Sequence, residues 1–417
     1  MVETNIRWIG KIPNNWKINK IGQIFNLRNE KVSDKEYSPL SVSKGGVVPQ
    51  MESVAKSDAS DDRKLVLAGD FAINSRSDRK MSCGVSLING SVSLINIVLF
   101  PKCNDLIYNE YMNYLLKNYG FAEEFYRWGH GIVADLWTTK WQEMKNIMIP
   151  VPSFSVQKQI CEFLNKKMFD IDSLIDVENK QIDILKEYKQ AIITDTVTKG
   201  LDKNVKMKDS LIEWIGFVPE SWKIVPLKNV CEIKTGSTPS TQIQEYFDGN
   251  INWFTPGDFK SDFIYESSRT ISSFAVEDCC IRLFPENTTL LIGIGGTAGK
   301  VALIKEKGYS NQQITALISK TNFDSLYLYY LMLSGTKYLK DNALYTTLPI
   351  ISNQYLSSFK VCMPSKDEQC KISNKIIEKC NDIDELIGVK KQKIETLEEY
   401  KKSLIYEYVT GKKEVIA

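Results

Sequence analysis

The side chains best suited to contact nucleic acid gather in a few polar segments of this chain. Arginine can pair bidentately with guanine, and asparagine or glutamine with adenine, in the major groove of DNA. Hydroxyls and backbone N–H groups bind phosphate oxygens. Solvated loops often have the same composition, so each segment is a candidate and no more. The candidate DNA contacts are Asn74, Ser75, Arg76, Arg79 and Lys80, then His130, then Thr235, Ser237 and Thr238, and finally Asn311, Gln312 and Gln313.

A glycine-rich segment, Gly293–Lys300, also has the composition of a phosphate loop. It departs from the Walker pattern, because Ile294 stands where glycine is needed and Val301 replaces the serine or threonine. It also lacks the helix that follows a dinucleotide-binding loop, since Val301–Ile304 is expected to form a strand. We interpret it as a strand connection whose glycines leave room for a ligand to approach the backbone.

No set of residues predicts catalysis or metal binding. His130 is the single histidine and the nine cysteines have no CxxC spacing, which argues against a Cys/His metal site. The sequence has no Asn/Asp-Pro-Pro-aromatic motif to grip a flipped base, and no recognisable set of nucleophile, base and orienting group. We therefore expect no catalytic residue, no metal and no cofactor in this chain.

The composition is that of a soluble globular protein with two or three domains. The chain has 417 residues, of which 43% are hydrophobic and 25% charged, enough for several buried cores. The net charge is only +2, so composition does not support nucleic-acid binding, which often shows a basic excess. The first residues lack the features of a signal peptide, and no apolar stretch of membrane-spanning length occurs. We expect a cytoplasmic protein with reduced cysteines and no membrane partner.

A duplicated frame encloses the candidate segments. The segment Trp8–Ile18, with the pattern Trp-Ile-Gly-x-x-Pro-x-x-Trp, returns 206 positions later as Trp214–Ile224. A Pro-Ser pair that begins at Pro152 returns at Pro364, an offset of 212. Between these anchors the two halves barely resemble each other. A repeated frame around unlike inserts predicts two similar modules that address two different things.

The two inserts, 17–152 and 223–364, both have the pattern of mixed α/β modules. Runs of β-branched residues alternate with Gly and Pro turns, and each insert contains an aromatic-rich helical patch. The Asn89-Gly90 pair after a β-branched run is a strong signal for a β-hairpin. Strands are expected at 65–67, 85–88, 289–292, 301–304 and 314–318, and helices at 111–116 and 327–332.

Each insert is followed by a segment typical of a long helix. Residues 155–198 contain no Gly or Pro, and 44 helical residues would extend roughly 66 Å. Gly200 and Gly411 are placed to end the two helices. Apolar residues step by three and four along both segments, which predicts a coiled-coil seam. The seam residues are Met168, Ile171, Ile175, Ile182, Leu185 and Ile192, with the counterparts Cys380, Ile383, Ile387, Ile394, Leu397 and Leu404.

Two apolar stripes in one chain are most simply buried against each other. A pseudo-twofold relation between the repeats would make the helices antiparallel and would place Glu178 near Lys390, a charge match that favours one register. The register and length of the helices would then fix the distance between the modules. The alternative is that each helix packs on its own module. The predicted fold class is α/β (α+β), with globular domains at 1–152 and 208–364 and long spacer helices at 153–207 and 365–417.

With these features the chain resembles the specificity subunits of type I restriction–modification systems. The resemblance covers nearly the whole chain and includes the opening of each half, the start and end of each long helix, and two segments of the second module. The sequence departs from the family at Cys362 and Cys370, where the family more often has other residues. The segments that carry the resemblance are the two Trp-Ile-Gly-x-x-Pro-x-x-Trp motifs, Ile149–Pro152 with Gln157, Pro364 with Gln369 and Ile372, Tyr188–Lys199, Tyr400–Gly411, Asn252–Asp258 and Asn311–Gln313.

The resemblance implies a non-catalytic chain that binds double-stranded DNA. Its modules would be target-recognition domains, each reading one half of an asymmetric bipartite site, and its helices would separate them and dock two methyltransferase subunits. Those partners would bind S-adenosylmethionine, flip an adenine and methylate it. Two motor–nuclease subunits would turn such a complex into a restriction enzyme.

Other functions are compatible with parts of the same sequence. A separate recognition chain of a type II restriction–methylation enzyme would have similar modules, and its neighbouring genes would distinguish it. A coiled-coil scaffold with protein-binding ends would not shift a DNA duplex in a salt-dependent way. A self-contained enzyme is disfavoured by the missing catalytic motifs.

Overall fold

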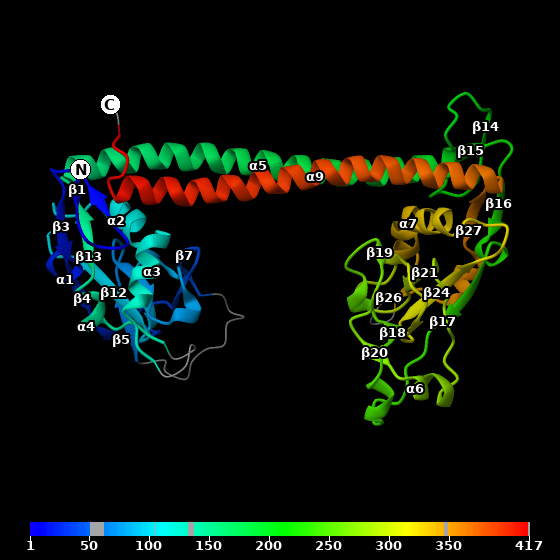
Figure 1. The fold of residues 1–417 in the computed structure, drawn as a ribbon, viewed down its shortest axis with the longest axis horizontal. Helices are drawn as coiled ribbons and strands as arrows, with labels where there is room; N and C mark the ends of the chain where they lie inside the picture. The colour runs from blue at the N-terminus through cyan, green and yellow to red at the C-terminus, as the bar shows by residue number, and fades with distance from the viewer. Residues whose placement is uncertain (51–61, 104, 132–136, 346–348, 416–417) are drawn as a thin grey trace. The chain divides into compact units, whose positions relative to one another are not determined.

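The computed structural model divides into two compact units (Figure 1). Unit 1 comprises Met1–Asn179 and Lys391–Ala417, and unit 2 comprises Lys180–Lys390. Each unit therefore holds one globular module and one half of each long helix. The structure describes residues 1–50, 62–103, 105–131, 137–345 and 349–415.

Unit 1 is built from antiparallel sheets and short helices. Its largest sheet has the strand order β10-β9-β12-β4, and a second sheet has the order β11-β8-β5. The chain enters and leaves the module through the antiparallel pair β3-β13, in which Lys17 lies opposite Val151. The strands are β1 (Val2–Glu3), β2 (Lys11–Ile12), β3 (Lys17–Lys20), β4 (Phe25–Arg28), β5 (Lys31–Val32), β6 (Leu40–Ser43), β7 (Gly46–Pro49), β8 (Arg63–Val66), β9 (Phe71–Asn74), β10 (Cys83–Val85), β11 (Gly90–Ser93), β12 (Asn96–Pro101) and β13 (Met148–Val151). The helices are α1 (Ile21–Ile24), the 3₁₀ turn η1 (Ser77–Arg79), α2 (Asn109–Leu116), α3 (Tyr119–Arg127), α4 (Trp141–Met144) and the first part of α5 (Phe154–Lys199).

Unit 2 has a five-stranded sheet of order β17-β24-β21-β22-β19 and a smaller sheet of order β20-β18-β23. Its module is also entered and left through one antiparallel pair, β16-β27, in which Lys223 lies opposite Met363. The strands are β14 (Met207–Asp209), β15 (Phe217–Pro219), β16 (Lys223–Pro226), β17 (Cys231–Thr235), β18 (Ile251–Phe254), β19 (Phe263–Ile264), β20 (Thr270–Ile271), β21 (Thr289–Ile292), β22 (Val301–Ile304), β23 (Tyr309–Ser310), β24 (Ile314–Ser319), β25 (Leu344–Tyr345), β26 (Pro349–Ile350) and β27 (Lys360–Met363). The helices are η3 (Leu227–Asn229), η4 (Gln244–Phe247), η5 (Pro256–Asp258), α6 (Ser273–Asp278), α7 (Ser325–Asp341), α8 (Asn353–Ser358) and the first part of α9 (Lys366–Val409).

The two modules share one strand order although their sequences differ. In unit 1 the pair β9 and β12 is flanked by β10 and β4, and in unit 2 the pair β21 and β24 is flanked by β22 and β17 in the same way. All of these pairings are antiparallel. Unit 2 adds β19, which is parallel to β22. The loops that leave β9 and β21 therefore hold equivalent places in the two modules.

The hairpin predicted at Asn89-Gly90 is wrong. Strand β10 ends at Val85 and β11 begins at Gly90 itself, and the two strands join β9 and β8 in different sheets. Gly90 is required for space, because a Cβ there would lie 2.6 Å from the carbonyl oxygen of Ser38 and from Cγ of Leu40. The Asn89 side chain accepts a hydrogen bond from the backbone N–H of Ala68 at 2.8 Å. The Asn-Gly pair thus serves a crossing between two sheets and forms no two-residue turn.

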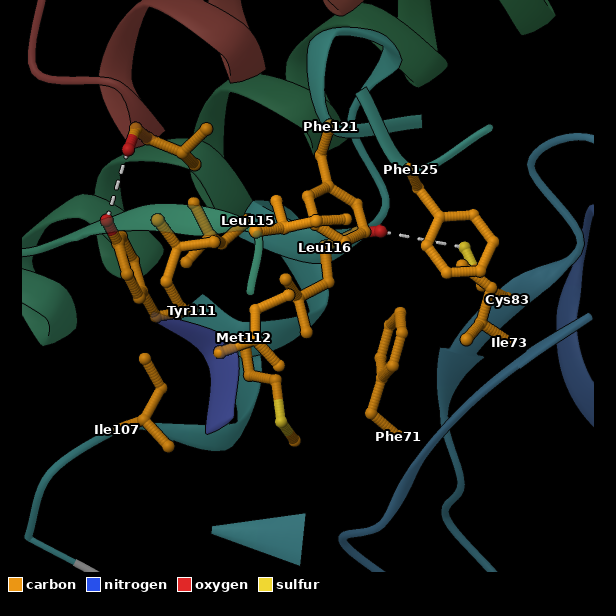
Figure 2. Close-up of a cluster of buried hydrophobic side chains, with 14 of the residues drawn as sticks. Phe71, Ile73, Cys83, Ile107, Tyr111, Met112, Leu115, Leu116, Phe121 and Phe125 are labelled. Carbon is orange, nitrogen blue, oxygen red and sulfur yellow. Dashed lines mark hydrogen bonds between the residues drawn. The ribbon is translucent and has the colours of Figure 1, made fainter. Parts of the chain in front are cut away.

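The core of unit 1 joins the module to both long helices (Figure 2). Helix α2 contributes Tyr111, which donates its hydroxyl proton to the carbonyl oxygen of Val409 in α9 at 3.1 Å. In unit 2, Tyr327 of α7 makes the same contact with the carbonyl oxygen of Val197 in α5 at 2.9 Å. Val197 and Val409 are 212 positions apart, so the repeated frame of the sequence is a repeated set of contacts.

A second repeated contact fixes the start of each long helix. Gln157 accepts a hydrogen bond from the backbone N–H of Tyr108 at 2.7 Å, and Gln369 accepts one from Asp324 at the same distance. Each glutamine also donates to the carbonyl oxygen of the proline five residues before it, at 3.0 Å. Both glutamines are buried and bonded on both sides, so they clamp the helix to its module.

The two long helices run antiparallel within each unit. In unit 1 Asp172 forms an ion pair with Lys401, and in unit 2 Lys189 pairs with Asp384 at 2.7 Å. The two ion pairs repeat at the offset of 212. Burial alone would lower the pKa of Lys189, but the hydrogen bond to Asp384 and the charge of Asp262 hold this pKa above its ordinary value.

The predicted seam is largely buried, which confirms the fold class with its two long antiparallel helices. Glu178, where the seam is interrupted, is 5% exposed and pairs with Lys393 at 2.5 Å within unit 1. The predicted proximity of Glu178 to Lys390, the coiled-coil geometry and the four-domain division stay predictions. The helices also pack on the modules, because Ile160 and Val409 both belong to the core of unit 1. The buried seam residues are Met168, Ile171, Ile175, Ile182, Cys380, Ile383, Ile387 and Leu404.

Replacing Trp222 by alanine should destabilise unit 2 by about 3–5 kcal/mol, the usual range for removing a buried aromatic ring. Trp222 is 2% exposed, and its indole N–H donates to Glu368, at the start of α9, at 3.1 Å. Phe217→Ala is the matched control, because this ring is 58% exposed and its loss should cost far less. Urea unfolding of the full chain measures both. A cost for Trp222→Ala no larger than that of the control would contradict the assigned packing.

Candidate nucleic-acid interface

The candidate residues of the second module lie together at one end of its main sheet. The loop after β17 contains Ser237, whose backbone N–H donates to the carbonyl oxygen of Ser310 at 2.9 Å. Beside it, the hydroxyl of Thr238 donates to the side-chain oxygen of Gln312. Two segments more than 70 residues apart in sequence therefore form one polar surface, with the hydroxyls of one next to the amides of the other.

Close backbone packing explains why the sequence folds this way locally. A Cβ on Gly236 would lie 2.2 Å from the Ser310 hydroxyl oxygen, so only glycine fits between the two segments. The indole N–H of Trp253 donates to the carbonyl oxygen of Ser237 at 3.2 Å. Asn311 is 9% exposed, and its amide donates to the side-chain oxygen of Gln313 at 3.0 Å. Asn311 thus stabilises the turn at 311–313. Gln312 and the hydroxyl-bearing Thr235, Ser237 and Thr238 are exposed.

Asn353 joins this surface, although nothing in the sequence suggests it. Its amide N–H donates to the hydroxyl of Thr235 at 2.8 Å, and its oxygen accepts from the hydroxyl of Thr315 at 3.2 Å. The side chain is nevertheless exposed. It lies 118 positions from Thr235, so no local motif connects them.

The glycine-rich segment lies beside the same surface and connects β21 to β22, as predicted. The backbone N–H of Gly293 donates to the carbonyl oxygen of Gln313 at 2.8 Å, and the N–H of Ile351 donates to the carbonyl oxygen of Gly293 at 2.8 Å. The Lys300 ammonium donates to the carbonyl oxygen of Phe259. The hydroxyls and amides named above are polar and uncharged, and Lys300 is an exposed cation of the adjoining segment.

In the first module the candidates follow β9. Ser77 begins the short turn η1, and its backbone N–H donates to the carbonyl oxygen of Trp137 at 3.0 Å. Thr138 forms two isolated antiparallel β-bridges, one with Arg76 and one with His130. His130 is therefore brought next to the arginine-bearing loop, in an exposed position. The sequence placed these residues more than 50 positions apart and gave no sign of their proximity.

Charge distinguishes this loop from its counterpart. Arg76 pairs with Asp78 at 3.0 Å, and Arg79 lies 3.7 Å from the same carboxylate. Lys80 forms an ion pair with Glu123, and its hydrogen bond holds the pKa of that carboxyl below its usual range. All three cations are at least partly exposed, so they can exchange these partners for phosphates or bases. Their pairing with carboxylates explains why the segment adds little net charge.

Two candidates of the first module are less accessible. Ser75 is 5% exposed, and its carbonyl oxygen accepts a hydrogen bond from the backbone N–H of Thr139 at 3.0 Å. Asn74 is half-buried, and its side chain accepts from the N–H of Arg76 at 3.1 Å. Asn74 and Ser75 therefore stabilise the loop through internal hydrogen bonds, and the side chains of Arg76 and Arg79 are more exposed.

The described part of the chain contains no cluster of three or more His, Cys, Asp or Glu residues that could hold a metal ion. All nine cysteines are free thiols. Among the described helices, none combines the length and the apolar composition needed to cross a bilayer.

Comparisons with known proteins place this architecture among a group of restriction-system proteins. A family model described as "Type I restriction modification DNA specificity domain" matches residues 219–399. The MjaIX specificity subunit of a type I restriction enzyme from Methanocaldococcus jannaschii is 38% identical over 189 residues, which are 44% of this chain and 43% of that protein. The MjaVIII specificity subunit of the same organism is 29% identical over 64% of this chain and 62% of its own length. The chain thus spans less than two thirds of these two relatives.

A third relative and two solved structures cover nearly the whole chain. The putative MjaX specificity subunit from the same organism is 23% identical over 97% of this chain and 95% of its own. A structure described as "Structural basis underlying complex assembly and conformational transition of the type I R-M system" has a TM-score of 0.68 at 14% identity, covering 96% of this chain and 98% of that one. The HsdS subunit from Thermoanaerobacter tengcongensis has a TM-score of 0.50 at 15% identity over the same shares. At such identities the structural matches establish the fold alone.

Proposed function

We propose that this chain is a specificity subunit of a type I restriction–modification system, the subunit that reads DNA. Each module reads one half of an asymmetric bipartite target. The observation that carries the proposal is the pair of modules with one strand order and unlike loops at equivalent places. A common scaffold with different loops is what two readers of different sequences require.

The two loop surfaces favour different DNA chemistry. In the first module, the guanidinium groups of Arg76 and Arg79 can donate two parallel hydrogen bonds to a guanine edge or a phosphate. The ammonium of Lys80 is suited to phosphate. In the second module, Gln312 and Asn353 offer exposed amides suited to adenine edges. Two half-sites read by such different groups have different sequences, so the full target is not a palindrome.

The duplicated segments around the two modules are suited to binding two copies of one partner protein. In unit 1 a hollow of about 1140 Å³ is lined by Trp8, helix α3 and the part of α9 that includes Tyr406. In unit 2 a hollow of about 710 Å³ is lined by Trp214 and the part of α5 that includes Thr194. Tyr406 and Thr194 are 212 positions apart, so both hollows belong to the repeated frame and are suited to equivalent surfaces. We propose that two methyltransferase subunits, which bind S-adenosylmethionine, dock there, with motor–nuclease subunits added in a restriction complex.

The lack of a recognisable catalytic motif in the sequence leads to a first functional prediction. The purified chain alone should transfer no methyl group to DNA, while its complex with the methyltransferase subunits should methylate adenine. Incorporation of label from S-adenosylmethionine into a target duplex measures this. Methyl transfer by the chain free of its partners would contradict the non-catalytic role.

The same complex tests DNA reading directly. It should shift a target duplex in a gel, and its affinity should fall as salt rises, because phosphate contacts release counterions. A protein-binding scaffold would leave the duplex unshifted at every salt concentration. A type II recognition chain would shift it, and genes encoding a fused methylase–nuclease next to this one would identify that alternative. We further propose a cytoplasmic location, which nine unpaired thiols support.

A further inference from the structure

The glycine-rich loop of unit 2 and the arginine-bearing loop of unit 1 occupy the same place in the fold. The first leaves β21 and returns as β22, and the second leaves β9 and returns as β10. β21 pairs with β22 and β24, just as β9 pairs with β10 and β12. The two loops therefore emerge from the same end of the same strand pair.

Both loops are also anchored to the same later segment of their module. In unit 1 a bridge joins Arg76 to Thr138, and in unit 2 a bridge joins Ile294 to Ile350. Each anchor lies just before a short helix, α4 or α8, that leads to the closing strand β13 or β27. Equivalent strands and equivalent anchors make the equivalence of the loops independent of their sequences.

The chemistry that the two loops present is different. The loop of unit 1 carries Arg76, Arg79 and Lys80 on its surface. In unit 2, Lys300 is exposed but its ammonium donates to the carbonyl oxygen of Phe259, and the tip consists of the half-buried Gly295 and the exposed Gly296 and Thr297. Among the described residues, a Cβ on Gly295 or Gly296 would meet no heavy atom within 4 Å. The tip thus offers main-chain groups and open space where the other loop offers cations.

A polar side chain with spare hydrogen-bonding capacity lies beside the loop. The loop contacts Gln313 and Ile351 through backbone hydrogen bonds, next to Asn353. Among the described residues, the Asn353 amide engages one of its two N–H groups and one of its two oxygen lone pairs. The second N–H group and the second oxygen lone pair of Asn353 are thus open to a ligand beside the glycine-rich loop.

We propose that the loop Gly293–Lys300 holds the sugar–phosphate backbone of the second half-site through the main-chain N–H groups of Gly296 and Thr297, in the place where the first module uses arginine. The N–H groups of Gly293, Gly295, Ala298, Gly299 and Lys300 already donate to carbonyl oxygens of the module and hold the loop in shape. Glycine allows the backbone to approach a phosphate closely because it has no side chain in between. Base reading in this module is left to the neighbouring amides. The inference rests on the proposed function and adds the ligand chemistry of this loop.

The test compares Gly296→Leu with Gly388→Leu in the complex with its methyltransferase subunits. Gly296 is exposed, has no left-handed φ, and has room for a side chain among the described residues, so the variant should fold. Gly388 is an equally open glycine on α9, far along the chain from any candidate residue. Gly296→Leu should lower the affinity for the target duplex by about tenfold or more, because charge-assisted hydrogen bonds to phosphate are lost. Gly388→Leu should leave it unchanged.

Base preference and salt dependence separate this role from others. The loss in Gly296→Leu should be the same for every single-base variant of the second half-site, because phosphate contacts carry no sequence information. The slope of log affinity against log salt should stay the same, whereas Arg76→Gln should reduce it by about one. An unchanged affinity, or a loss confined to particular bases, overturns the inference. A wild-type complex that binds no duplex would instead overturn the proposed function.

Discussion

Replacing residues 223–364 with the corresponding module of a relative should exchange one half-site of the methylated target and leave the other unchanged. The expected change is complete, because the new module brings its own reading loops and none of the old ones. The structure makes this exchange simple: the segment begins in β16 and ends just after β27, and these strands pair with Lys223 opposite Met363. The chain therefore enters and leaves the module at a single place.

The reciprocal exchange of residues 17–152 is the matched control, because β3 and β13 close the first module in the same way. It should change the other half-site. Sequencing of methylated bases in cells that carry each hybrid chain measures both outcomes. A hybrid in which both half-sites change would mean that the modules are not independent readers.

The regular elements were predictable because their signals are local. Strands β21 and β22 have the predicted bounds, 289–292 and 301–304. Gly200 and Gly411 end the long helices with φ of +77° and +70°, the left-handed conformation that glycine adopts without strain. Such features depend on alternation, helical periodicity and single-residue conformation, all of which can be recognised in a short stretch of sequence.

The assembly of the candidate interface was not predictable, because it depends on contacts between distant segments. The residue types were identified, but the contact of Thr238 with Gln312 and the role of Asn353 required the fold. The Asn89-Gly90 hairpin failed for the same reason, since packing against Ser38 overrode the local turn preference. Local chemistry indicates which groups are available, and only the strand order determines which of them meet.

The duplicated frame was predictable as a repeat, but the contacts that realise the repeat were not. The sequence offset of 212 predicted that the two halves repeat, and the ion pairs Asp172–Lys401 and Lys189–Asp384 realise that repeat in three dimensions. Each pair joins α5 to α9 within one unit. An antiparallel helix pair held at matched points in this way has one register, which is what a spacer of defined length needs.

Lengthening both long helices by one turn should change the preferred spacing between the half-sites. Four helical residues add about 6 Å. Base pairs are stacked about 3.4 Å apart, so the preferred spacer should grow by roughly one or two pairs. An insertion directly after Pro152 would break the contact of Gln157 with that proline. The matched insertions therefore go after Asn179 in α5 and after Lys390 in α9, where the chain passes between the units.

Methylation of synthetic duplexes with graded spacers measures the result. Methylation of the original target should fall sharply, a longer spacer should restore it, and both half-site sequences should stay the same, because neither module is altered. An insertion in α5 alone is the control: it makes the two connections between the units unequal, so it should lower methylation at every spacer length. If the doubly lengthened chain keeps the original optimum, the helices do not set the spacing, and the distance between half-sites must be fixed by the docked partners instead.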